Sequence, residues 1–344
     1  MPRTLRKRSN WWTLGKLALG LGLLILVIRF VDFRQVLRLF SRLGPGSVLV
    51  LFIIFLIDRL LMAYKWGLLL RGCGVRVGLG HLVTAYIYSN FAGSFMPASV
   101  GGDVVRFFAV VRRSVPAQAL LASMIVEKLG GFLGMGVMAS AAALVVSTRY
   151  ARSDHALTVG VVVAGATLAV MLAVGLMARG TGRGLVERAG MRLLGRFGEK
   201  ARALKWQIRD ILRKTRTLIA FFLLTLLEQC LPVISLWVLA GGLGISAGFG
   251  PLACVVLIGL FLARIPVSIS GIGVQEGVYV GLFVLMGMPA EEGLALSLGA
   301  RLLDIVFPFA VIVLRFPDAL RTVRRARIER LPGEGEVPST GGQP

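Results

Sequence analysis

Cysteine and histidine are scarce in this sequence, and their scarcity excludes several kinds of site. Three cysteines and two histidines occur in 344 residues, and none has the spacing of a zinc or haem centre or of a disulfide framework. The sequence also lacks a P-loop, a Gly-x-Ser-x-Gly elbow and an HExxH zinc motif. We therefore expect no metal and no other cofactor, and the motifs weigh against an enzyme without deciding the question.

Acidic residues are also few, because 17 Asp and Glu stand against 39 Lys and Arg, which gives a formal net charge of +22. Such an excess can indicate a nucleic-acid-binding protein. Here, however, the basic residues crowd into the connections between apolar segments, which is typical of the positive-inside pattern of membrane proteins. We therefore expect a membrane and not a nucleic acid as the partner.

Apolar residues dominate what is present. They make up 56% of the chain, only 16% of residues are charged, and the mean hydropathy is +0.80. Several apolar segments are long enough to cross a bilayer, so the sequence predicts an all-α integral membrane protein. The basic amino end has no cleavage signal after it, so the first span is expected to be retained. We predict six full spans, at residues 14–28, 47–70, 117–147, 157–178, 218–240 and 294–314.

Two further apolar segments are interrupted by proline and glycine. The first covers residues 79–111 and has Pro97, Gly101 and Gly102 at its centre. The second covers residues 252–288 and repeats the arrangement, with a proline, small residues, two glycines and then an ionisable residue. A continuous helix is not expected through either centre. Paired interruptions of this kind are typical of binding sites inside transporters.

The charges that flank these segments predict a topology. Basic residues border the first interrupted segment on both sides, whereas the end of the second has acidic residues only. We interpret the two as re-entrant broken-helix hairpins that enter from opposite faces, as in an inverted repeat, with both termini cytoplasmic. Eight transmembrane helices are the alternative, and the charge pattern does not decide between them. Residues 1–330 then form a single polytopic domain, and residues 331–344 a disordered tail.

The connection at residues 179–216 carries twelve basic residues and three acidic ones. It predicts an amphipathic cytoplasmic helix against anionic lipid, with a site for a regulatory partner as the alternative. A second surface feature is expected at Tyr64, Lys65 and Trp66, which have the composition of an interfacial anchor.

Several ionisable residues fall inside the predicted spans. Each would cost roughly 2.5 to 3.5 kcal/mol at the centre of a lone helix, so they must pair or line a hydrated cavity. Arginine beside a broken helix suits a phosphate group, because its planar fork binds phosphate bidentately and free backbone N–H groups lie nearby. We expect Arg106 and Arg301 to hold phosphate and Arg264 to be a weaker candidate. Asp103, Glu127 and Glu276 would balance or gate them.

These stretches resemble the flippase-like family represented by the transmembrane region of lysylphosphatidylglycerol synthase. The resemblance is carried by Asn90 and the Pro-x-x-x-Gly-Gly-Asp-x-x-Arg element at residues 97–106, by Glu127-Lys128, by the Pro-x-Ser-x-x-Gly-x-Gly-x-x-Glu element at residues 266–276, and by Arg301. It covers about residues 10–325. It implies translocation of a charged or glycosylated lipid between leaflets. The synthase's soluble aminoacyl-transferase domain is not expected here, and neither is lysine transfer.

We therefore expect a lipid translocase that binds an anionic phospholipid or a lipid-linked glycan at mid-membrane depth, in a bacterial-type plasma membrane. A membrane-embedded glycosyl or phospholipid transferase and a non-transporting scaffold for a lipid-modifying enzyme are the alternatives. Oligomeric state is left open. The candidate substrate-binding residues are Asn90, Pro97, Gly101, Gly102, Asp103, Arg106, Glu127, Arg264, Ser268, Gly271, Gly273, Glu276, Arg301 and Asp304.

Overall fold

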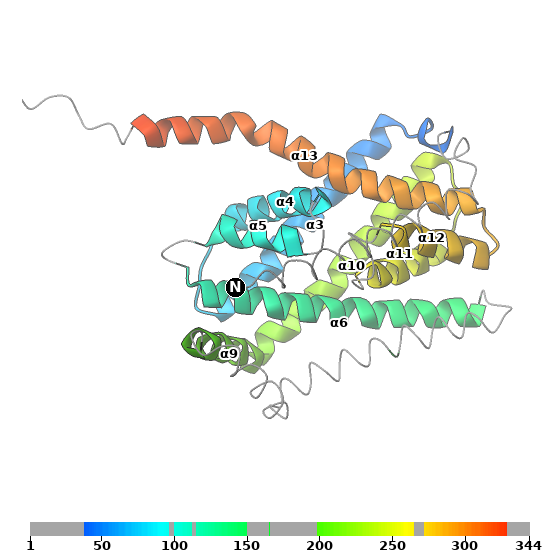
Figure 1. Ribbon diagram of the computed structural model, residues 1–344. Helices are drawn as coiled ribbons and strands as arrows, with labels where there is room; N and C mark the ends of the chain where they lie inside the picture. The colour runs from blue at the N-terminus through cyan, green and yellow to red at the C-terminus, as the bar shows by residue number, and fades with distance from the viewer. Residues whose placement is uncertain are drawn as a thin grey trace, which may run out of the picture.

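The computed structural model of the chain describes residues 38–95, 100–111, 115–149, 165, 198–264 and 272–328. Its regular elements in these ranges are α-helices, joined by short connections (Figure 1). The first predicted span and nearly all of the fourth lie outside the described residues. So do Pro97, Ser268, Gly271 and the predicted tail.

Four long apolar helices form the frame of the molecule: α3 (Pro45–Gly72), α6 (Ala117–Arg149), α10 (Thr215–Leu243) and α13 (Ala290–Ile328). Each contains an apolar stretch of 25 to 30 residues, which exceeds the roughly 20 residues needed to cross the hydrocarbon core. They coincide with four of the predicted spans. The chain is therefore a multi-pass membrane protein, as the sequence predicted.

Local sequence sets where two of these helices start and stop. Pro45 occupies the first turn of α3, where its missing N–H has no partner to lose. Gly244 ends α10 in the left-handed conformation, with φ at 75°, and its N–H bonds the carbonyl of Ala240.

Four shorter helices lie within this frame: α4 (Leu79–Phe95), α5 (Val100–Val110), α11 (Phe249–Ala263) and α12 (Val274–Leu285). At 1.5 Å per residue each is shorter than the hydrocarbon core of about 30 Å. The breaks between α4 and α5 and between α11 and α12 fall at the proline–glycine segments, as predicted. Figure 1 shows α4 and α5 beside one half of α6, and α11 and α12 beside its other half.

Close helix contacts depend on glycine at several of these interfaces. A Cβ on Gly130 or Gly134 of α6 would lie 2.6 Å from the Phe221 ring or 2.8 Å from the Thr225 methyl group on α10. Gly130 and Gly134 are four residues apart, the small-xxx-small spacing that permits close contact between helices. On the other side of the molecule, a Cβ on Gly259 of α11 would lie 2.5 Å from the ring of Tyr279 on α12.

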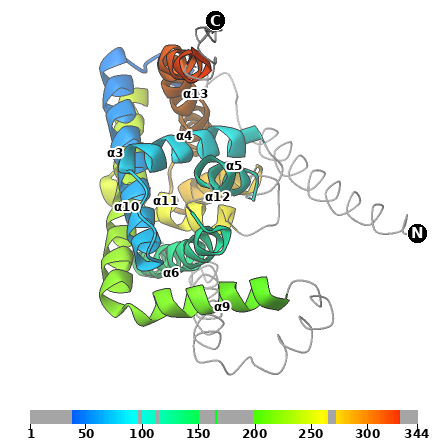
Figure 2. The ribbon, with the colours of Figure 1, turned by 90° about the vertical axis from the view of Figure 1, so that its left-hand side faces the viewer.

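The largest apolar core joins the halves of the bundle around α11. Phe132 of α6 packs against Phe261 of α11, with ring centroids 5.0 Å apart, and Phe55 of α3 lies 5.7 Å from Phe307 of α13. A smaller core fills the space among α3, α4, α5 and the start of α6. Helix α9 (Gly198–Arg213) belongs to neither group. It lies crosswise to α6 at the end of the bundle where α6 begins (Figures 1 and 2).

Candidate functional site

Arg106 lies in a buried ionic cluster between α5 and α6. Its side chain is 4% exposed, and its Nη1 atom lies 3.0 Å from the carboxylate of Glu127 on α6. Its Nη2 atom lies 3.3 Å from Asp103, one turn earlier on α5. The guanidinium also lies over the rings of Trp66 and Tyr86, 4.6 and 4.5 Å from their centroids. Two carboxylates and two aromatic faces thus stabilise a cation that is costly to bury alone.

The two carboxylates of this cluster have further partners. The hydroxyl group of Tyr86 donates a hydrogen bond to Glu127, and Lys128 forms an ion pair with Asp103. Lys128 is half exposed whereas Glu127 is buried, so the cluster runs from the interior to the surface of α6. Asp103 therefore bridges one buried and one accessible cation.

Glycine brings α5 close enough to α4 to build this cluster. A Cβ on Gly102 would lie 2.6 Å from the backbone oxygen of Ser89 on α4, and the Ser89 hydroxyl donates to the Gly102 carbonyl over 2.7 Å. A larger residue at this position would push the helices apart. The predicted site residues Asn90 and Gly101 are half-buried on the same two helices.

A second ionic cluster lies at the start of α12. Gly273 precedes the helix with φ at 80°, a conformation that favours glycine, and its N–H donates to Glu276 over 2.7 Å. The other carboxylate oxygen of Glu276 lies 2.8 Å from Nε of Arg301 on α13. Glu276 is 1% exposed. The structure thus places Gly273, Glu276 and Arg301 together.

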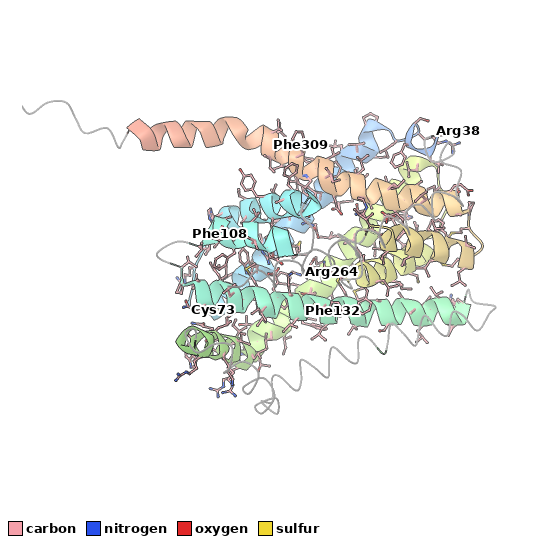
Figure 3. All side chains as sticks on the ribbon, in the orientation of Figure 1. Arg38, Cys73, Phe108, Phe132, Arg264 and Phe309 are labelled. Atoms are coloured by element: carbon pink, nitrogen blue, oxygen red, sulfur yellow. The ribbon has the colours of Figure 1, made fainter. Side chains whose placement is uncertain are left out.

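Arg264 lies near the first of these clusters. It ends α11 and faces the region where the two pairs of short helices meet (Figure 3). Its side chain is exposed, and among the described residues no carboxylate lies within 4.0 Å of it. It interacts electrostatically with Glu127 and Asp103 of the first cluster and with Asp58 and Arg59 of α3. An accessible cation near the middle of a membrane protein is expected only where water or a polar ligand can reach it.

Asp304, on α13, is an exposed acidic residue. It interacts electrostatically with Asp58 and Arg59, and with Arg301 one turn earlier on its own helix. Asp58 and Arg59 form an ion pair with each other on α3. The sequence analysis left this pair out of the site, although two adjacent charges inside an apolar span were a signal for it.

The sequence prediction for Lys65 and Trp66 was wrong. Instead of forming an interfacial anchor they are 3% and 0% exposed, and only Tyr64 of the three is exposed. Lys65 forms a buried ion pair with Glu228 on α10, and Trp66 donates to Ser123 over 3.0 Å. The reason is that α3 packs against α6 and α10 at this depth, and hydropathy alone does not reveal which side of a span meets a neighbouring helix.

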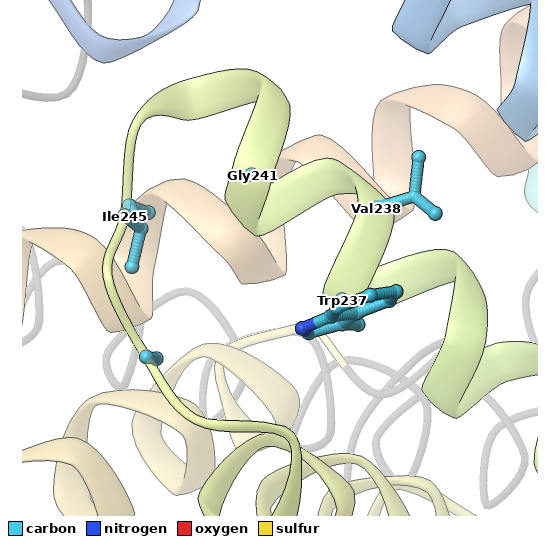
Figure 4. A pocket seen from close by; sticks show the side chains of 5 residues that line it. Trp237, Val238, Gly241 and Ile245 are labelled. Carbon is cyan, nitrogen blue, oxygen red and sulfur yellow. The ribbon is translucent and has the colours of Figure 1, made fainter.

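Other features of the described residues do not compete with this region as a site. No group of three or more His, Cys, Asp or Glu side chains within them is arranged to hold a metal ion. A small pocket at the end of α10 is lined by Trp237, Val238, Gly241, Ile245 and Ala247 (Figure 4). Its lining contains no ionisable side chain, so it offers no charged partner to a ligand.

Comparison with known proteins agrees with this architecture. Residues 13–312 match the family described as the lysylphosphatidylglycerol synthase TM region. The chain belongs to this family. It is also 22% identical over 321 residues to a UPF0104 membrane protein of Methanothermobacter thermautotrophicus, a match that covers 88% of this chain and 92% of that protein. The family resemblance predicted from the two interrupted segments is therefore confirmed.

Proposed function

We propose that this family member translocates a lipid with an anionic headgroup between the leaflets of a bacterial-type plasma membrane. The observation that carries the proposal is the exposed Arg264, which ends α11 near the buried cluster around Arg106. A second buried ionic cluster surrounds Glu276 at the start of α12. Membrane lipids present a phosphate at the end of an apolar body. Such a molecule needs a polar contact at a depth where hydrocarbon offers none.

The order of contacts follows from which arginines already have partners. Arg106 and Arg301 are both bonded to carboxylates, so a phosphate must compete with Glu127 or Glu276 to reach them. Arg264 has no such competitor among the described residues, which makes it the first contact for the headgroup. The bidentate fork of its guanidinium fits a phosphate group.

The carboxylates then act as internal counterions. When no headgroup is bound, Glu127 and Asp103 stabilise Arg106, and Glu276 stabilises Arg301. A bound phosphate would shift these pairings, so that binding is coupled to the packing of α5 on α6 and of α12 on α13. We infer that the exposed Asp304 meets a cationic group of the ligand or a proton.

The two pairs of short helices supply a pathway to this site from each side. We infer that α4 and α5 form one re-entrant hairpin and α11 and α12 the other, in an inverted repeat with cytoplasmic termini. Arg71, Arg76 and Lys214 lie at the end of the bundle where α4 begins, and Glu291 and Glu292 lie at the other, as this orientation requires. Arg38 and Arg42 lie at the same end as Glu291 and do not follow the pattern. Single cysteines introduced near Gly102 and Gly273 would be labelled from opposite sides, whereas eight plain crossings would give another pattern.

Translocation is tested with the purified chain in liposomes that contain a panel of headgroup-labelled lipids, anionic phospholipids and lipid-linked glycans included. We expect exchange of at least one anionic lipid between leaflets. Arg264→Gln should abolish it, whereas Arg38→Gln, at an exposed arginine outside this region, should leave it unchanged. A chemically altered lipid would instead indicate a transferase. If no lipid of the panel is either exchanged or modified, the proposal is refuted and a scaffold function remains.

A further inference from the structure

The helix α9 has one apolar face, and that face is turned toward the protein. Ile211 is fully buried, and Leu204 and Ile208 pack partly buried against the same cluster, which contains Leu69 of α3 and Phe221 of α10. An amphipathic helix on a membrane normally inserts its apolar face into the lipid. In α9 this face is already covered, which leaves its opposite face as the surface that other molecules can reach.

The end of α9 is fixed at the level where two spans end. Lys214, which follows α9, contacts the carbonyl of Gly72 and lies 2.7 Å from Asp210. Gly72 is the last residue of the apolar span α3, and α10 begins at Thr215. The last turn of α9 is therefore level with the boundary of the apolar region, and Figures 1 and 2 show the helix crosswise to α6. A helix placed in this way runs along the plane of the membrane surface.

The outward face of α9 is cationic and contains a tryptophan. At about 100° per residue, one sector of the helix holds four exposed basic residues with Trp206 beside them. The indole of Trp206 is 63% exposed. Asp210, which lies beyond Trp206 on the helix surface, is bound to Lys214. The four basic residues are Arg202, Lys205, Arg209 and Arg213.

We infer that this face of α9 binds the phosphate-bearing headgroups of anionic lipids in the cytoplasmic leaflet. Three observations select a lipid surface: the face is level with the end of a span, it carries four exposed basic residues, and it exposes tryptophan. Tryptophan favours the membrane interface because it combines an apolar ring with an N–H donor. The sequence analysis expected this helix to lie against anionic lipid, and the structure shows that its apolar face is covered by the protein. The inference does not depend on lipid translocation.

The test uses quenching of Trp206 by brominated lipids in liposomes that contain the full chain. Bromine is placed near the top of the acyl chains of either phosphatidylglycerol or phosphatidylcholine, at equal mole fraction. The contribution of Trp206 is the difference between the wild type and Trp206→Phe, since the chain has five tryptophans. We expect stronger quenching by the anionic lipid, and this preference should weaken as salt rises.

Substitution of the basic residues measures the source of the preference. A surface cation adds about 1 kcal/mol of attraction to anionic lipid, which is about a fivefold effect, so Arg209→Gln should reduce the preference by up to about that factor. Replacing all four basic residues of the face with glutamine should abolish it. A matched variant loses four exposed arginines elsewhere and should keep the preference. Its changes are Arg38→Gln, Arg42→Gln, Arg76→Gln and Arg149→Gln.

Unchanged quenching of the other tryptophans shows that each variant retains its fold. Equal quenching of Trp206 by the two lipids would overturn the inference, and so would a preference that survives the fourfold substitution. If neither lipid quenches Trp206, the face is directed to the cytosol and an acidic protein becomes the better partner. Each of these results can be obtained whether or not the chain moves lipid between leaflets.

Discussion

The ion pair between Arg106 and Glu127 gives the sharpest prediction of stability. Both side chains are nearly inaccessible, at 4% and 8% exposed, and their charged groups lie 3.0 Å apart. Removing one partner of such a buried pair costs about 3 to 5 kcal/mol, because the other charge stays buried without its counterion. Asp103 still lies 3.3 Å from Arg106, so we expect Glu127→Gln to cost about 3 kcal/mol, at the lower end of that range.

The measurement is the free energy of unfolding in mixed detergent micelles, with SDS as the denaturant. A double-mutant cycle completes the argument, because Arg106→Met combined with Glu127→Gln removes both charges. The double variant should lose less than the sum of the two single variants. Tyr86→Phe deletes only one hydrogen bond to the same carboxylate and should cost about 1 to 3 kcal/mol.

A matched control is Glu291→Gln, in the first turn of α13, where no ion pair forms among the described residues. We expect it to change the unfolding free energy by less than about 1 kcal/mol. If Glu127→Gln is no more destabilising than this control, or if the cycle shows additive losses, Arg106 and Glu127 are not coupled. The account of a balanced buried cation would then be wrong.

Three further predictions concern packing and accessibility. Lys65→Met should destabilise the protein by about 3 to 5 kcal/mol in the same assay, because it strands Glu228 in the interior, and Lys65→Met/Glu228→Met should recover most of that loss. Gly134→Ala should cost about 1 to 3 kcal/mol through its contact with α10, whereas Gly131→Ala, with open space around it, should be neutral or slightly stabilising. Burial raises the pKa of Cys73 from 9.0 to about 11, so its alkylation rate in the folded protein should keep rising from pH 9 to 11. With Cys230 and Cys254 replaced by serine, that rise should level off near pH 9 once SDS unfolds the chain. Because the pKa of Cys73 is higher in the folded than in the unfolded state, its ionisation lowers the stability of the folded protein as pH rises through this window.

The sequence revealed the spans and their interruptions because both are local properties. An apolar run of the length of α3 or α10 has few alternatives to crossing a bilayer. Proline and paired glycines mark the break between α4 and α5 regardless of what packs around them. Arg106, Glu127, Glu276 and Arg301 were chosen because each is a charge in an apolar context. The structure pairs them as Arg106 with Glu127 and Arg301 with Glu276.

The sequence could not show which charged residues pair with each other, or which side of a helix faces the rest of the protein. Lys65 and Glu228 are 163 residues apart, and no local pattern connects them. Apolar residues are spread around the whole of a span such as α3, so its sequence does not indicate which side faces lipid and which faces protein. The same limit explains α9. Its amphipathic pattern was evident from the sequence. That pattern did not show whether its leucine and isoleucine side chains would contact lipid or the apolar side chains of α3 and α10.

The distribution of charge in the interior suggests why Arg264 differs from its neighbours. Burying an ion pair is at best weakly favourable, and a well-packed apolar pair would often be more stable. The fold nevertheless retains the pairs at Arg106 and Glu276, and both clusters lie beside breaks in helices. A structure selected for stability alone would have an apolar residue in place of Arg264, or would at least pair it with a carboxylate. In our proposal, a ligand supplies the negative charge that is missing at Arg264. Loss of exchange in Arg264→Gln, with stability unchanged, is therefore the result that the proposal requires.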